Sequence, residues 1–199
     1  MENMIDTNST MGEPIFIRHN REKMLNAMIF FLKNTKKCGK IKILKLLYFL
    51  DFIHFKQTGR SVTDLRYFAW EKGPVARELF YELSKPKDDL KNHIAILPSS
   101  PGEFLKMIPR KKFDQKYFSK RELKIMAQVA DIFKEADANE MSEVSHLPNE
   151  PWDKTKKFKG ISAEIDYMLS LDNTKESLSK ERAQEIVNER EEVRLLFCQ

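Results

Sequence analysis

Histidine and cysteine are the first residues to test for chemistry, and in this chain they are few and scattered. No two of the four histidines show the H-x-x-x-H spacing of a zinc-binding helix, and no Cys-His set has zinc spacing. The two cysteines, Cys38 and Cys198, form neither a C-x-x-C pair nor a disulfide framework, as expected in a reducing cytosol. The sequence therefore predicts no metal site.

Two histidines, His54 and His146, are candidates for a catalytic or ligand-binding role, and for both we favour a structural role instead. His54 falls in a strongly apolar segment, where a hydrogen-bonded core histidine is the expected case. His146 begins the segment His-Leu-Pro-Asn-Glu-Pro-Trp that ends at Trp152. A histidine and a tryptophan that flank a proline turn can lock the turn by stacking and hydrogen bonds.

Signatures of nucleophilic catalysis and nucleotide binding are absent from the sequence. It has no G-x-S-x-G elbow, no G-x-x-x-x-G-K-[ST] loop and no G-x-G-x-x-G turn. Glu71, Glu78 and Glu82 lie near one expected helix, with the spacing of ordinary surface charges. We predict no catalytic, cofactor-binding or metal-binding residue, no cofactor and no enzymatic activity.

The densest run of positive charge lies between Lys106 and Lys124, in a chain whose net charge is +5. Such a cluster can attract phosphates or an acidic protein surface. We favour a solvated loop that leads into a helix, because no nucleic-acid-binding motif accompanies the cluster. A DNA-binding regulator that uses residues 106–124 stays as an alternative.

An aromatic corner around a Gly-Pro pair is the strongest remaining signal. It contains Trp70, Gly73, Pro74, Val75 and Tyr81. A tryptophan just before a fixed backbone bend can pack on a neighbouring helix, and it can also anchor a partner protein. We favour packing from physics alone and retain these residues as candidates for partner binding.

The elements that must position this corner are mainly helical. The chain is 41% hydrophobic and has only six glycines, which favours a mainly α, compact helical domain with a few short β-strands. Lys40–Gln57 is apolar on nearly every side and predicts a buried central helix. Its charged residues Lys42, Lys45, Asp51 and Lys56 are expected where the helix meets water or a partner.

Shorter elements precede and follow the central helix. Before it we expect an extended piece at Pro14–Ile17 and an amphipathic helix at His19–Thr35. After it we expect a strand at Leu65–Trp70 and a helix to Ser84 with Pro74 at its first position. The β-like runs Ile94–Leu97 and Phe104–Ile108 either form a hairpin or flank a mobile loop.

The second half of the chain carries clearer helix signals. Ser119-Lys-Arg-Glu122 is a capping box that starts a helix, and Asn139 opens a short helix that stops before Pro148. Trp152–Ile161 is expected to be irregular and Ser162–Leu169 to form a short helix. Ser179 caps a final charged helix whose apolar stripe includes Ile186 and Val193, two further candidates for partner binding.

Neither a membrane span nor a signal peptide is predicted. The longest apolar run, Ile43–Phe55, is short and is interrupted by charged residues. Residues 1–13 are polar and lack a basic region followed by an apolar one, so we expect a flexible N-terminus. The expected location is the cytoplasm.

The aromatic corner, together with the helix before it, resembles the Panacea domain family of SocA-like antitoxins. The family's core-helix motif is matched by Lys45-Leu-Leu-Tyr-Phe49, and its W-x-x-G-P-V motif by Trp70 to Val75 with Tyr81 following. His146 and the Pro-Trp pair at Trp152 match its distal motif. The resemblance covers about residues 24–165, although the Glu-Lys before Gly73 and the tail beyond Leu171 depart from the family pattern.

This resemblance implies a mainly helical domain that neutralises a cognate toxin protein by direct binding, often encoded in prophages and other mobile DNA. It also implies an alternative, a proteolytic adaptor that delivers a bound protein to a protease. We accordingly divide the chain into residues 1–13, a Panacea-like domain at 14–171 and a C-terminal helical tail at 172–199. The sequence does not predict the oligomeric state.

Overall fold

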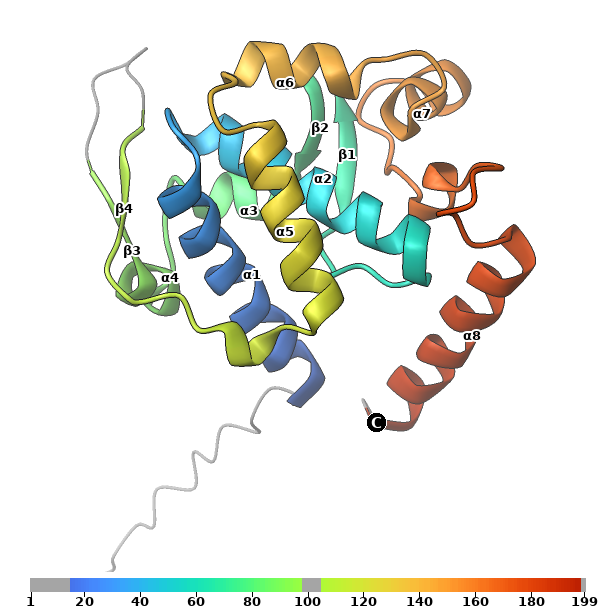
Figure 1. The fold of residues 1–199 in the computed structure, drawn as a ribbon, viewed down its shortest axis with the longest axis horizontal. Helices are drawn as coiled ribbons and strands as arrows, with labels where there is room; N and C mark the ends of the chain where they lie inside the picture. Colours follow the sequence, from blue (N-terminus) through green and yellow to red (C-terminus); the bar gives the residue numbers. More distant parts are fainter. Residues whose placement is uncertain (1–14, 98–104, 198–199) are drawn as a thin grey trace, which may run out of the picture.

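Three helices form the centre of the structure, a computed structural model that describes residues 15–97 and 105–197. Helices α1 (Ile15–Asn34), α2 (Lys40–Thr58) and α5 (Lys120–Ile132) pack against one another (Figure 1). The shorter elements surround them, and within the described residues the β-strands form two small antiparallel hairpins. The predicted mainly α fold is confirmed.

Helix α2 is the buried central helix that the sequence predicts. Leu44, Leu46, Leu47 and Leu50 are all within 1% of complete burial, so the helix has no wide solvated face. It ends at Gly59, whose φ of 70° lets its N–H close the last turn on the Phe55 carbonyl. The capping box of Ser119 and Glu122 at the start of α5 is also present.

Three charged residues of α2 are buried rather than at a solvated edge, which corrects the expectation from sequence. Lys42, Lys45 and Asp51 are each at most 1% exposed. Asp51 accepts hydrogen bonds from two backbone N–H groups and two hydroxyl groups. Each charge is buried because polar groups from distant segments reach it. Lys56, by contrast, reaches the surface and pairs with Asp172 at 2.5 Å.

A hairpin of β1 (Tyr67–Trp70) and β2 (Gly73–Ala76) covers one side of α2. The prediction that Pro74 starts a helix is wrong, because Pro74 lies in β2 and α3 spans Arg77–Glu82. Pro74 is tolerated because it sits opposite Ala69, whose N–H and C=O bond outward to Ala163 and Ser162. No ladder bond across the hairpin therefore needs a proline N–H.

The β-like runs at Ile94–Leu97 and Phe104–Ile108 are expected from the sequence either to form a hairpin or to flank a mobile loop, and the structure shows which alternative is correct. Strand β3 (Ile94–Ile96) follows helix α4 (Asp88–His93) and pairs with β4 (Met107–Pro109), so these runs do form a hairpin. Phe104 and the rest of 98–104 lie outside the described residues.

Two expectations for irregular or extended chain are wrong. Residues Ile15 to Ile17 belong to α1, and Pro14 and residues 1–13 lie outside the described residues. The segment expected to be irregular contains α7 (Pro151–Lys159). Pro151 suits the first position of α7, and lysines occupy its last turn, where cations stabilise helix ends. The low apolar content of α7 concealed its periodicity.

The remaining elements of the second half link α5 to the last helix. A 3₁₀ turn, η1 (Gln115–Tyr117), precedes α5, and α6 (Ala138–Ser145) follows it as a short helix that stops before Pro148, as expected. The expected helix at Ser162–Leu169 is reduced to a 3₁₀ turn, η2 (Tyr167–Ser170), because Ala163 and Glu164 pair with the outer edge of β1.

The last helix, α8 (Lys180–Phe197), lies at the edge of the molecule beside the end of α2 (Figure 1). The Ser179 hydroxyl accepts from the Arg182 N–H, as expected for its cap. Ala183 packs with Phe55 and Leu171 in a small apolar cluster separate from the main core. Farther along α8, Arg190 pairs with Asp64. No helix in the described part of the chain is both long and apolar enough to cross a membrane.

Candidate functional site

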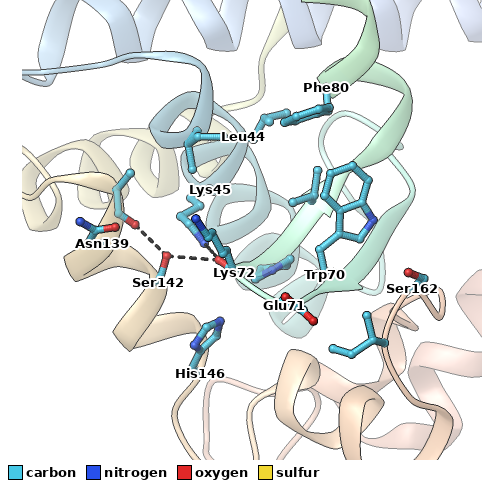
Figure 2. Close-up of a pocket in the computed structure, with 15 residues that line it drawn as sticks. Leu44, Lys45, Trp70, Glu71, Lys72, Phe80, Asn139, Ser142, His146 and Ser162 are labelled. Carbon is cyan, nitrogen blue, oxygen red and sulfur yellow. Dashed lines mark hydrogen bonds between the residues drawn. The ribbon is translucent and has the colours of Figure 1, made fainter. Parts of the chain in front are cut away.

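A pocket of about 850 Å³ opens where the first hairpin meets α2 and α6 (Figure 2). Its walls combine apolar side chains with a few polar groups of α2 and α6. The residues that line it are Ile41, Leu44, Lys45, Trp70, Glu71, Lys72, Pro74, Val75, Phe80, Ala138, Asn139, Ser142, His146, Ile161 and Ser162. Its size is in the range of pockets that hold a small ligand or a few side chains.

Lys45 forms the polar part of the α2 wall. Its ammonium donates to the Lys72 carbonyl at 3.0 Å, and so ties α2 to the hairpin turn (Figure 2). Burial lowers the pKa of Lys45 to about 8, because the charged form is poorly solvated there. Lys45 is still mainly protonated at neutral pH.

Gly73 has no Cβ, and the Lys45 ammonium lies next to the position where a Cβ would be. A Cβ at Gly73 would lie 2.5 Å from Lys45 Nζ, 3.1 Å from Ser145 Oγ and 3.2 Å from His146 Nε2. The φ of Gly73 is 113°, a conformation that side-chain-bearing residues rarely adopt. Glycine is therefore required here both by the backbone and by three polar atoms that converge on it.

His146, at the end of α6, lines the pocket close to Lys45 and is held by stacking on Trp152. Their ring centroids are 3.7 Å apart with an interplanar angle of 18°, as the proline-turn interpretation predicts. Trp152 in turn donates from Nε1 to the Trp70 carbonyl at 2.9 Å. Burial and the nearby Lys45 lower the pKa of His146, which favours the neutral form of its imidazole.

The His146 Nε2 atom is buried and has no hydrogen-bond partner among the described residues. Buried polar atoms are nearly always paired, so such an atom requires an explanation. It lies in the pocket wall that also contains Lys45.

The apolar rim consists of side chains from four segments. Trp70 packs edge-on against Phe80 at 5.0 Å between centroids, and Lys40 lies over the Phe80 ring at 3.6 Å. Ile41 and Ile161 are 41% and 43% exposed, so apolar surface is available at the mouth.

The structure separates the candidate partner-binding residues into three places. Trp70, Pro74 and Val75 line the pocket, and Gly73 touches its polar wall. Tyr81 is 61% exposed and lines a different depression beside Glu78 and Glu82. On α8, Ile186 lies over Gly59 while Val193 is exposed.

Lys45, Ser142 and His146 are pocket residues that the sequence analysis did not assign to a site. A lysine within an apolar helix is the signal that could have indicated one, because a buried ammonium needs polar partners. The fact that His146 and Lys45 share a pocket depends on the packing of α6 against α2, which no local pattern encodes.

The basic segment is dispersed over β4, η1 and the start of α5 rather than gathered on one element. Lys116 pairs with Asp114 at 2.8 Å, and Lys111 Nζ lies 3.2 Å from His93 Nε2. Within the described residues, no group of three or more His, Cys, Asp or Glu side chains is placed to hold a metal ion.

The corner and most of the residues that line the pocket lie within a recognised domain. A family model described as antitoxin SocA-like, Panacea domain, matches residues 43–153, which is more than half of the chain. Neither the curated proteins nor the solved structures give a match. The matched range contains most of α2, the first hairpin and α6. The chain belongs to the SocA-like antitoxin family of Panacea-domain proteins.

Proposed function

We propose that this protein is an antitoxin that neutralises a cognate toxin by direct protein binding and catalyses no reaction of its own. The single observation that carries the proposal is the family match, which includes Lys45, Trp70 and His146 of the pocket. The apolar rim supports it, because partly exposed aromatic and exposed aliphatic side chains around a concavity are typical anchors for a protein partner.

Co-expression with the product of the neighbouring reading frame tests the proposal. We expect that product to arrest growth alone, growth to resume when this protein is present, and the two to co-purify. A neighbouring product that is harmless alone, or that stays toxic beside well-expressed soluble protein, would contradict the proposal.

The half-life of the partner separates direct inhibition from the proteolytic-adaptor alternative. Direct inhibition leaves the half-life unchanged or longer and accumulates a stable complex. A half-life that shortens only in cells containing a particular protease would instead assign the adaptor role.

Two isoleucines give a matched test of the pocket rim. Ile41, at the mouth, and Ile132, at the end of α5, are both exposed helical isoleucines. We expect Ile41→Gln to weaken toxin binding by roughly tenfold, because it removes apolar contact area, and Ile132→Gln to leave it unchanged. Titration calorimetry with the purified toxin measures both. Equal effects, or none at Ile41, would place the contact elsewhere.

A further inference from the structure

We infer that the pocket between the hairpin and α6 receives a carboxylate of the partner protein, an Asp or Glu side chain flanked by an apolar residue, and that Lys45 binds it. This inference rests on the proposed function and specifies the chemistry of the toxin segment that docks.

The first argument is the unused donor capacity of Lys45. An ammonium has three N–H donors, and the Lys72 carbonyl accepts one of them. No carboxylate pairs with Lys45 among the described residues, although the side chain is only 1% exposed. A buried charge without a counter-ion is costly, and an incoming carboxylate would supply that counter-ion.

Lys42 provides a comparison on the same helix. Its ammonium is equally buried, but it donates to three carbonyl groups, of Lys36, Lys134 and Ala136. The fold itself thus satisfies the donors of Lys42, whereas two of the donors of Lys45 have no acceptor among the described residues. Lys42 lines a different, smaller depression of about 540 Å³, whereas Lys45 lines the pocket of about 850 Å³ that also contains His146.

The second argument is the unpaired His146 Nε2. It lies in the same polar wall as Lys45, since both atoms approach the position of a Cβ at Gly73. A neutral imidazole protonated at Nε2 is a donor, and a carboxylate has acceptor sites for both groups. One occupant would therefore satisfy both residues.

Charge and shape favour the same occupant. Lys72 lines the mouth, and Lys156 lies 4.8 Å from the Trp152 ring beneath His146, so the surroundings are positive. Glu71, the acidic side chain among the described lining residues, is exposed on the hairpin turn and makes no hydrogen bond to Lys45. Trp70 and Phe80 add an aromatic wall for an apolar neighbour of the acid.

Peptide selection tests the inference without requiring knowledge of the toxin. A library of random linear peptides is selected on the immobilised full-length protein, and enriched peptides are synthesised. We expect them to contain Asp or Glu beside an aromatic or aliphatic residue. Replacing that acid by its amide in the peptide should weaken binding at least tenfold, a test that needs no protein variant.

A pair of lysine variants assigns the contact. Lys45→Met keeps the length of the side chain and removes the donors, and Lys91→Met changes an exposed lysine on α4. We expect at least a tenfold loss of peptide affinity in Lys45→Met and none in Lys91→Met, with thermal melting as the check on folding. Enriched peptides without acids, no enrichment at all, or affinity independent of Lys45 would overturn the inference.

The outcomes separate this inference from the proposed function. If the protein neutralises the toxin but the selected peptides bind without an acid, the antitoxin function is supported and the carboxylate site is refuted. If acidic peptides bind through Lys45 but the neighbouring product is not neutralised, the carboxylate site is supported and the antitoxin function is refuted. In light scattering, the wild type could also form a dimer that Lys45→Met abolishes. That result would assign the pocket to a second copy of this chain and overturn the inference.

Discussion

At the scale of single residues, the buried charged side chains of α2 differ in how many of their donors or acceptors form hydrogen bonds within the fold. The carboxylate of Asp51 accepts from the N–H groups of Val62 and Thr63, both at 2.8 Å, and from the hydroxyls of Thr63 and Tyr67. It thereby fixes the loop between α2 and the first hairpin, although complete burial makes its charged form expensive.

We predict that Asp51 makes stability depend on pH in the acidic range. Burial raises the pKa of Asp51 to about 6, above its ordinary value of 3.8. The folded protein then holds a proton that the unfolded chain releases, so the contribution of Asp51 to stability is fully present below pH 4 and is lost as the pH rises through 6. Over that window the loss is on the order of 2–3 kcal/mol.

The variant Asp51→Asn isolates this contribution because it cannot titrate. Urea unfolding of both proteins between pH 4 and 7 should show the wild type losing stability relative to Asp51→Asn as the pH rises. A stability difference that is constant over this range would contradict the prediction.

Lys42 and Lys45 give a second prediction at this scale. Lys42 Nζ binds the Lys36 and Ala136 carbonyls at 2.7 Å and 2.5 Å and so joins the ends of α1 and α5 to α2. Lys42→Met removes the donor from the Lys36 and Ala136 carbonyls, although the Lys134 carbonyl still accepts from the Lys36 N–H, and should cost about 2–4 kcal/mol. Lys45→Met loses one such bond and should cost about 1 kcal/mol. Denaturant unfolding compares the two, and equal costs would contradict the argument.

At the scale of elements, the first hairpin depends on the conformation of Gly73. We predict that Gly73→Ala destabilises the protein by about 2–4 kcal/mol and abolishes toxin binding, because a Cβ displaces Lys45 and strains the backbone. Gly160→Ala is the control. Its φ is also positive, at 86°, but its Cβ would meet nothing within 4 Å.

Thermal melting and toxin-binding assays on both glycine variants check this prediction. Gly160→Ala should share the cost of backbone strain, about 1–3 kcal/mol, and retain binding. Retained binding in a folded Gly73→Ala variant would show that Lys45 and its pocket are not the contact.

Elements with strong local patterns could be predicted from the sequence. The central helix follows from its apolar residues, β1 from Tyr67 to Trp70, and the start of α5 from Ser119 and Glu122. Pro74 misled the prediction because a proline suits both a helix start and a strand position without a ladder bond. The polar α7 gave no periodicity to detect.

The candidate site could be predicted only in part, and the division has a physical reason. Trp70, Pro74 and Val75 were identified because they share one short segment, and all three line the pocket. Lys45 and His146 are about 100 positions apart, and their meeting depends on tertiary packing. A charged residue in an apolar helix indicates that it has hydrogen-bonding partners in the fold, but the sequence does not identify which residues those are.

At the scale of the whole molecule, the matched domain lies between two helices that the match does not include. Helices α1 and α8 fall outside residues 43–153, but α1 contributes Leu25, Met28 and Phe31 to the main core. Helix α8 contributes instead to the small cluster of Phe55, Leu171 and Ala183. The two flanking helices therefore differ in their importance for folding.

We predict that a chain ending after Leu171 still folds, with lower stability and altered affinity for its partner. Removing Ala183, Ile186 and the Arg190–Asp64 pair uncovers the end of α2 but leaves the main core intact. The expected cost is about 2–4 kcal/mol. Calorimetry should show one cooperative transition at reduced temperature, and loss of that transition would show that α8 is essential to the fold.

The positions of the two tryptophans of this chain have a practical consequence. Trp70 lines the pocket, and Trp152 lies against the His146 ring and donates to the Trp70 carbonyl. The indole emission of the unlabelled protein thus originates entirely from this small region. Stopped-flow fluorimetry can follow occupancy there in real time, without a dye or a tag.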